Sequence, residues 1–211
     1  MAEAATKGPL LVGLTGSIGM GKTETGKLFA RLGLPVYDAD SVVHELYQKG
    51  GVGSELIAEA FPEAVRDGRV DRERLAAAVS GNETEFKKLE SIIHPLVRAA
   101  ERKFIAAAVQ RGDELVILDI PLLYETKGTD RMDAVVVVSA PEKTQRERVL
   151  ARPGMTAEKL EAISTRQVPD GEKRAKADYV IETDKGLEHA FEQVKRVAAD
   201  LRRRAALKRQ S

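Results

Sequence analysis

The chain has 211 residues, which is enough to bury a core and suits one compact α/β unit with inserted subdomains. Its 34 Lys and Arg residues balance 33 Asp and Glu residues, and the net charge of +1 gives no long-range attraction for nucleic acid or a membrane. The absence of cysteine excludes disulfides, thiolate metal sites and a cysteine nucleophile, and it agrees with a reducing compartment.

The start of the chain predicts a strand, a tight loop and a helix. Residues 1–9 contain no long apolar stretch, so we expect neither a signal peptide nor a membrane span, and a cytoplasmic protein. The apolar run at residues 10–14 indicates a strand, which ends in Thr15 and Gly16. A helical pattern follows at residues 22–31.

Four further runs predict strands. Residues 115–118 and 135–138 are apolar at every position, which is typical of parallel strands with helices on both faces. Residues 35–37 and 179–181 are shorter candidates, and helical segments separate all of these runs. The predicted fold class is therefore α/β, a three-layer sandwich around a five-stranded parallel sheet.

The remaining core segments favour helices. Residues 139–142 resemble a capping box with an early proline, so we expect a helix from there through Val149, ended by residues 152–154. Apolar residues at helical spacing predict a last helix over residues 187–201, with a polar tail that frays. Arg202, Arg203 and Arg204 are interpreted as a solvated helix end rather than a nucleic-acid contact.

Residues 41–110 differ from the rest of the chain, because their patterns are mostly helical and no long strand is indicated. Glycine pairs and His94-Pro95 punctuate the segment. We interpret it as a helical insertion.

One motif indicates phosphate binding. The segment G-x-x-x-x-G-K-T follows the first strand and opens a helix, which is the context that a P-loop requires. Its residues are Gly16, Ser17, Ile18, Gly19, Met20, Gly21, Lys22 and Thr23. Backbone amides of such a loop bind phosphate oxygens, the lysine reaches the β- and γ-phosphates, and the threonine hydroxyl binds Mg²⁺. The alternative is a glycine-rich turn that matches by chance.

Phosphoryl transfer also needs an acceptor for the hydroxyl proton. Asp38 and Asp40 follow the short strand at residues 35–37, and we prefer Asp40 as the base, with Asp38 as an anchor for substrate or metal. Alternatively, one of the two caps the helix that starts near Ser41. Asp119 ends the strand at residues 115–118, where it is expected to help hold Mg²⁺ or, alternatively, to cap a loop.

Three arginines follow the fourth strand. Arg146, Arg148 and Arg152 lie on or just after its helix, and a guanidinium there can stabilise charge on the transferring phosphoryl group. Arg148 and Arg152, four residues apart, are expected on one helix face. The alternative is a solvated charged surface.

His94 is interpreted either as a packing residue at a helix start or as a ligand, and the chain's three histidines do not indicate a metal site.

Taken together, these motifs resemble the dephospho-coenzyme A kinase family over nearly the whole chain. The resemblance rests on residues 15–23, 36–40, 70–75, 89–97, 118–125, 145–152 and 173–181. His94-Pro95-Leu96 and Pro121-Leu122-Leu123, in this order, separate this family from other P-loop proteins. Glu24 departs from the family, which more often has a small hydroxyl residue there.

The resemblance implies ATP-dependent phosphorylation of the ribose 3′-hydroxyl of dephospho-coenzyme A, with Mg²⁺ accompanying ATP. It implies a nucleotide-binding core of residues 1–40, 104–146 and 168–211, a substrate domain of residues 41–103 and a lid of residues 147–167. Asp40 would act on the hydroxyl, Arg148 and Arg152 would close over ATP, and Arg72 and His94 would contact the substrate.

Two other functions are compatible with a P-loop in an α/β fold. A related kinase would phosphorylate a nucleoside monophosphate, a sugar or shikimate. A nucleotide-dependent switch protein would bind GTP and signal to a partner, but the chain lacks an evident Asn-Lys-x-Asp segment for reading guanine.

Overall fold

The computed structural model describes residues 8–210, which form two compact units. One unit contains residues 8–37 and 107–210, and the other contains Asp38–Ala106. The expectation about a signal peptide falls mostly on residues 1–7, which lie outside the described residues. Over residues 8–210, each helix is too short or too polar to cross a bilayer.

A five-stranded sheet organises the first unit, in the order β2-β5-β1-β6-β7. The strands are β1 (Leu10–Thr15), β2 (Val36–Asp38), β5 (Leu115–Asp119), β6 (Ala134–Ser139) and β7 (Tyr179–Glu182). The β1–β5, β1–β6 and β6–β7 ladders are parallel, and Val12 pairs with both Ile117 and Ala134. All five predicted strands and the parallel sheet are confirmed, with β1 and its following loop at the centre.

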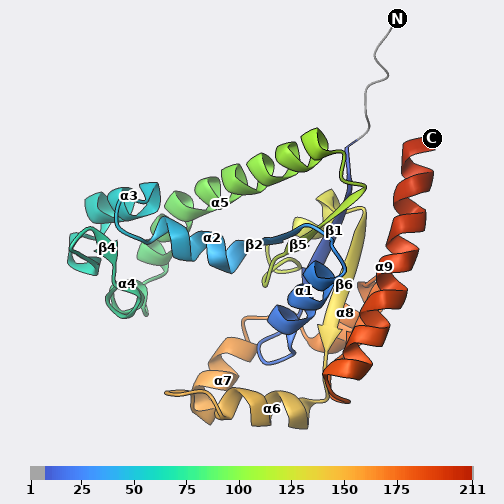
Figure 1. Ribbon diagram of the computed structural model, residues 1–211. Helices are drawn as coiled ribbons and strands as arrows, with labels where there is room; N and C mark the ends of the chain where they lie inside the picture. Colours follow the sequence, from blue (N-terminus) through green and yellow to red (C-terminus); the bar gives the residue numbers. More distant parts are fainter. Residues whose placement is uncertain (1–7, 211) are drawn as a thin grey trace, which may run out of the picture. The chain divides into compact units, whose positions relative to one another are not determined.

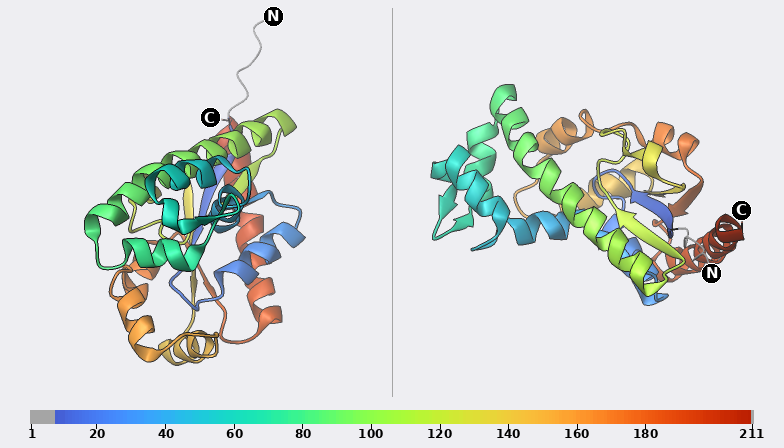
Figure 2. Two further views of the ribbon diagram at one scale, coloured as in Figure 1. Left: turned by 90° about the vertical axis from the view of Figure 1, so that its left-hand side faces the viewer. Right: turned by 90° about the horizontal axis from the view of Figure 1, so that it is seen from above.

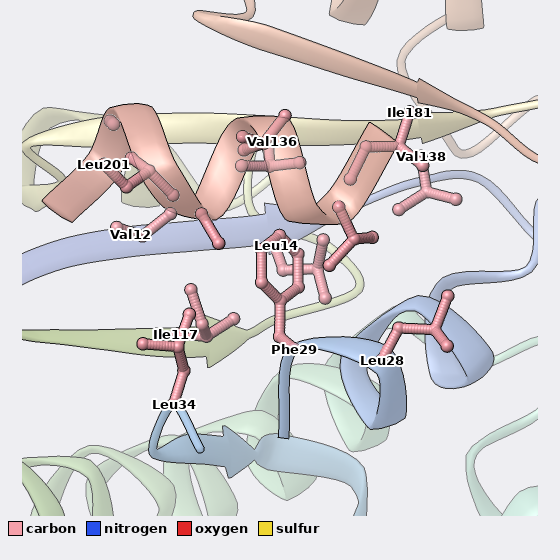
Figure 3. Packing of buried hydrophobic residues seen from close by; sticks show 14 of the residues in the cluster. Val12, Leu14, Leu28, Phe29, Leu34, Ile117, Val136, Val138, Ile181 and Leu201 are labelled. Carbon is pink, nitrogen blue, oxygen red and sulfur yellow. The ribbon is translucent and has the colours of Figure 1, made fainter. Parts of the chain in front are cut away.

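Helices α1 (Lys22–Arg31) and α9 (Leu187–Gln210) pack on one face of this sheet. Phe29 of α1 and Leu201 of α9 are fully buried, and they lie against strand residues such as Leu14 and Val136 (Figure 3). Alternate residues of a strand point to opposite faces, so Val135 and Val137 lie on the other side. The segment after β5 and helix α8 (Asp170–Lys176) cover that side, which completes the three predicted layers.

Two helices connect β6 with α8: α6 (Glu142–Leu150) and α7 (Ala157–Ser164) (Figure 1). The predicted α6 is confirmed, but its capping box is wrong. Pro141 occupies the cap position without a side-chain hydrogen bond, and Ser139 is still part of β6. From the strand, the Ser139 hydroxyl donates to Asp170 Oδ2 at 2.7 Å instead of reaching the helix amides.

Helix α9 continues to Gln210, so the prediction of a frayed tail after residue 201 is wrong. Arg202 donates to Glu114 Oε1 at 3.1 Å and to the Leu32 carbonyl at 3.1 Å. Arg204 donates to Asp178 Oδ1 at 2.9 Å and to a main-chain carbonyl. These arginines are partly exposed at the helix end, and the tertiary bonds of Arg202 and Arg204 stabilise its last turns.

The second unit is mainly helical, as predicted for the insertion. It contains α2 (Ala39–Leu46), α3 (Val52–Ala60), α4 (Arg72–Val79), the 3₁₀ turn η1 (Pro62–Ala64), a short hairpin of β3 (Val65–Arg66) and β4 (Arg69–Val70), and most of α5 (Glu83–Arg111). Ile57, Phe61, Leu75 and Ile93 are among its own buried core residues.

Helix α5 runs through Pro95 without a break, and both views in Figure 2 show it as one helix. His94-Pro95 therefore does not mark a helix start. A proline removes one helical hydrogen bond and costs about 3 kcal/mol in a helix interior. Ile93 beside it is buried in the core of this unit, and we attribute the continuity of the helix to that packing.

Candidate active site

The P-loop motif connects β1 to α1, as the strand, loop and helix pattern predicted. Gly19 and Gly21 have φ values of 78° and 92°, in the left-handed region that glycine adopts without strain. A Cβ on Gly19 would lie 2.5 Å from Val149 Cγ2, so the loop packs directly on α6. The Met20 amide donates to the Ser17 carbonyl at 3.2 Å, which closes the curl of the loop.

Gly21 is the N-cap residue of α1 and has no side chain to cap the helix. The first amides of a helix have no partner within the helix, and they carry the positive end of its dipole. The P-loop therefore places main-chain N–H donors and the N-terminus of α1 at the same point, and such an arrangement binds phosphate.

Lys22 and Asp119 lie together at this point. Lys22 Nζ is 2.6 Å from Asp119 Oδ1, and the two side chains are only 12% and 5% exposed. Gly26 of α1 makes room for the carboxylate, because a Cβ there would lie 3.2 Å from Asp119 Oδ2. The structure thus brings together the lysine of the P-loop and the carboxylate at the end of β5.

Thr23, the other residue predicted to bind the metal, lies in the first turn of α1 and is exposed. Among the residues that the structure describes, its hydroxyl has no hydrogen-bond partner, so this oxygen is available to a ligand. Glu24 beside it pairs with Lys27 at 2.7 Å on the exposed surface of the helix.

Arg148 and Arg152 line one cavity of about 320 Å³. P-loop residues Gly19 and Gly21 line the same cavity, together with residues of α1 and the start of α9. Arg148 donates to the Thr183 hydroxyl at 2.9 Å and to the Thr183 carbonyl at 2.7 Å. Arg152 lies beyond the end of α6, so the two arginines do not share a helix face, although they reach the same cavity.

The two aspartates after β2 have different surroundings. Asp38 is the N-cap residue of α2, and its carboxylate accepts from the Ser41 amide at 3.1 Å and the Ser41 hydroxyl at 2.8 Å. Asp40 is exposed in the first turn of α2, and within residues 8–210 its carboxylate makes no hydrogen bond or ion pair. Asp38 is thus the helix cap, and Asp40 is the carboxylate that remains available.

Arg72 and His94 lie in the second unit, on α4 and α5. The Arg72 guanidinium lies 5.7 Å from the ring centre of Tyr47. Burial raises the pKa of the Tyr47 hydroxyl, and the charge of Arg72 partly offsets that rise. His94 is exposed, 3.8 Å from Glu90, and lines a cavity of about 390 Å³ that Arg72 does not line.

Thr183 supports the P-loop but was not among the residues predicted from the sequence. Its hydroxyl donates to the Met20 carbonyl at 2.7 Å while it accepts from Arg148. Thr183 directly follows β7, and a polar residue at the carboxyl end of a predicted parallel strand was the available signal.

Arg98 and Arg102 were also not predicted from the sequence as site residues. They line the cavity beside His94 at four-residue spacing, which becomes visible once α5 is known to be continuous.

Gln145 and Gln167 were also not singled out, and each bonds the main chain of Ile18 in the P-loop. Gln145 Nε2 donates to the Ile18 carbonyl at 2.8 Å, and the Ile18 amide donates to Gln167 Oε1 at 3.1 Å. Neither contact has a local signal in the sequence, because both partners are more than a hundred residues from Ile18.

The sequence matches known proteins over most of its length. Residues 10–189 match the family model of dephospho-CoA kinase. The dephospho-CoA kinase of Mesorhizobium japonicum is 53% identical over 193 residues, which cover 92% of this chain and 97% of that protein. The dephospho-CoA kinase of Agrobacterium fabrum is 50% identical, with 91% of this chain and 98% of that protein covered.

Solved structures resemble the chain over most of its length. The crystal structure of TT1252 from Thermus thermophilus has a TM-score of 0.78 at 35% identity, covering 92% of this chain and 99% of that one. A dephospho-CoA kinase from Campylobacter jejuni has a TM-score of 0.63 at 21% identity, covering 90% and 96%, which supports the fold. The family match includes the P-loop, Asp119 and both arginines of the cavity, and the chain belongs to the dephospho-CoA kinase family.

Proposed function

We propose that this chain transfers the γ-phosphoryl group of ATP to the ribose 3′-hydroxyl of dephospho-CoA, giving CoA and ADP. The P-loop with Lys22 and Asp119 carries the proposal, in a chain that is 53% identical to a dephospho-CoA kinase over 92% of its length. We place the reaction in the cytoplasm, in agreement with a chain that contains no cysteine.

The P-loop residues Gly16 to Thr23 bind the phosphates in this proposal. Lys22 leaves its ion pair with Asp119 and contacts the β- and γ-phosphates. The hydroxyl of Thr23 and the carboxylate of Asp119 are oxygen donors of the kind that Mg²⁺ prefers, so the residues fit this ion. When bound with ATP, the ion neutralises charge on the phosphates.

Asp40 is the proton acceptor in this proposal. The 3′-hydroxyl oxygen bonds to the γ-phosphorus, its proton passes to the Asp40 carboxylate, and the bond to the β,γ-bridging oxygen breaks to release ADP. The exposure of Asp40 and its lack of a partner within residues 8–210 support this role. Asp38 holds the first turn of α2, on which Asp40 lies, and thereby orients the base.

The other site residues divide between the two substrates. Arg148 and Arg152 contact ATP, since both line the cavity beside the P-loop, and residues 147–167 act as the lid. Residues 41–103 bind dephospho-CoA, with Arg72 and His94 exposed for contact with its phosphates. The nucleotide-binding core comprises residues 1–40, 104–146 and 168–211.

The test is an acceptor assay with purified full-length protein. ATP and Mg²⁺ are incubated with dephospho-CoA, a nucleoside monophosphate, shikimate or gluconate, and ADP release is measured. We expect release with dephospho-CoA far above the other acceptors, and a phosphorus NMR signal for a 3′-phosphomonoester. Release with another acceptor alone would contradict the assignment, and preference for GTP without acceptor turnover would indicate a switch protein.

A further inference from the structure

The Ile18 peptide groups of the P-loop are held on both sides by glutamine side chains. Gln167 Oε1 accepts from the Ile18 amide at 3.1 Å, and Gln145 Nε2 donates to the Ile18 carbonyl at 2.8 Å. Hydrogen-bond chemistry fixes the orientation of both side-chain amides. The Ile18 N–H requires an oxygen as acceptor, and the Ile18 C=O requires an NH₂ group as donor. Ile18 therefore has both of its main-chain polar groups satisfied by side chains.

These two glutamines bracket the segment proposed as the lid. Gln145 lies on α6 just before residues 147–167, and Gln167 is the last residue of that segment. Figure 1 shows α6 and α7 next to the loop that connects β1 with α1. The last residue of the segment and a residue just before its start are thus bonded to a single residue of the P-loop.

The Gln167 end is anchored by a buried ion pair. The Val168 amide donates to Glu125 Oε1 at 2.9 Å, and Lys173 Nζ lies 2.8 Å from the same oxygen. The Lys173 side chain is 0% exposed. Burial works to raise the pKa of Glu125, but the ion pair with Lys173 and main-chain amide donors outweigh it, and the pKa is lowered. The ionised carboxylate therefore keeps the main chain next to Gln167 in place.

The orientation of the Ile18 carbonyl matters for phosphate binding. Gly19 follows Ile18, and its left-handed φ of 78° allows the intervening peptide group to rotate at low cost. Rotation would break the bond from Gln145 and redirect a carbonyl oxygen, with its partial negative charge, within the loop proposed to bind phosphate. The bond from Gln145 holds this oxygen on the side of α6, and the bond to Gln167 holds the preceding amide.

We infer that Gln145 and Gln167 are positioning residues for the nucleotide, which hold the Ile18 main chain so that the P-loop keeps its phosphate-binding curl and stays bonded to the chain just before and at the end of residues 147–167. Neither side chain needs to contact the phosphates for this role. The inference adds to the proposed function, but it concerns only the nucleotide side of the reaction.

The experiment replaces each glutamine by methionine, which keeps the side-chain length but removes the hydrogen bond. In Gln167→Met, we expect the Ile18 amide of the free protein to exchange with solvent about tenfold faster by NMR. We expect the Kd for ATP to rise about tenfold in Gln145→Met and in Gln167→Met, from the loss of one partly buried hydrogen bond. Gln167→Glu keeps an acceptor oxygen and should restore slow exchange at Ile18.

Gln110→Met is the matched control, because Gln110 is exposed on α5 and has no hydrogen bond from its side chain within residues 8–210. Its Kd for ATP and its Ile18 exchange should match the wild type. The double variant should raise the Kd by less than the product of the single effects, since both glutamines act on one residue. Thermal unfolding midpoints identify any variant with a folding defect, and Gln167→Asn then replaces Gln167→Met.

Unchanged Ile18 exchange in Gln167→Met, or wild-type Kd values for ATP in both methionine variants, would overturn the inference. These measurements use ATP without an acceptor. A protein that binds ATP but fails to phosphorylate dephospho-CoA would therefore contradict the proposed function and leave this inference standing.

Discussion

At the scale of single residues, Asp38 and Asp40 show how two identical side chains acquire different tasks. Both Asp38 carboxylate oxygens accept hydrogen bonds from Ser41, which is the geometry of a helix cap. Asp40, two residues later, is exposed and has no partner within residues 8–210. A proton acceptor needs a free oxygen, and this difference favours Asp40.

Asp40→Asn should lower kcat about 100-fold or more, because it removes the proton acceptor. The Kd for ATP should stay close to that of the wild type, since the base acts mainly in the transition state. Steady-state kinetics with dephospho-CoA and calorimetric ATP titrations measure the two quantities.

Asp38→Asn is the matched control for this prediction, because asparagine also caps helices well. Its kcat should remain near that of the wild type. A larger loss of kcat in Asp38→Asn than in Asp40→Asn would make Asp38 the base, and an equal loss of ATP affinity in Asp40→Asn would make Asp40 a nucleotide residue.

At the scale of elements, packing of α9 on the sheet stabilises the first unit. Leu201 is fully buried against strand residues, whereas Leu207 on the same helix is 65% exposed. Leu201→Ala should lower the free energy of unfolding by about 2–5 kcal/mol, and Leu207→Ala should change it by about 0.5 kcal/mol or less. Urea denaturation measures both, and equal effects would show that α9 does not depend on this packing.

The buried pair of Glu125 and Lys173, which joins the segment after β5 to α8, predicts a pH dependence. The pKa of Glu125 lies below its ordinary value of 4.5, so at intermediate pH the unfolded chain binds a proton that the folded chain does not. The stabilisation that Glu125 contributes is therefore fully present at pH values above its ordinary pKa. It is lost as the pH falls through the lower pKa that Glu125 has in the folded chain.

Urea unfolding from about pH 7 to pH 3 tests this dependence. Glu125→Gln alone leaves Lys173 buried without a counter-charge and should cost about 3–5 kcal/mol. The double variant Glu125→Gln with Lys173→Met removes both charges, and its unfolding free energy should fall less steeply toward acid pH than that of the wild type. Glu188→Gln, at an exposed position, is the control, and identical acid slopes in the double variant and the wild type would refute the prediction.

At the scale of the whole molecule, nucleotide binding should stabilise the folded chain by mass action. Mg-ATP at one hundred times its Kd should add about 2.7 kcal/mol to the free energy of unfolding and raise the thermal midpoint. At the same concentration, Lys22→Ala should lose most of this increase, because it removes the positive charge at the P-loop phosphates.

Lys27→Ala is the control for Lys22→Ala, since Lys27 lies on the same helix in an exposed pair with Glu24. Differential scanning calorimetry with and without Mg-ATP compares the three proteins. An undiminished increase in Lys22→Ala would remove this lysine from the nucleotide site.

Local pattern was sufficient to predict the helix at residues 22–31, whose bounds agree with α1, and all five strands of the sheet. The spacing of apolar residues and the positions of glycine and proline determine these elements, and both act over a few residues of the chain. The same locality explains the errors. Pro95 was interpreted as a break because its local cost is real, but burial of Ile93 keeps α5 continuous.

The P-loop motif determined by itself where the main chain curls, because glycine spacing and the following helix specify that geometry locally. Only the tertiary structure decided that Asp119 meets Lys22, that Arg204 bonds to Asp178 and that Gln167 holds Ile18. Ile18 and Gln167 are 149 residues apart, and folding of the sheet brings them within hydrogen-bond distance. Side chains that act across such separations leave no periodic signal, because their partners are chosen by packing rather than by neighbours along the chain.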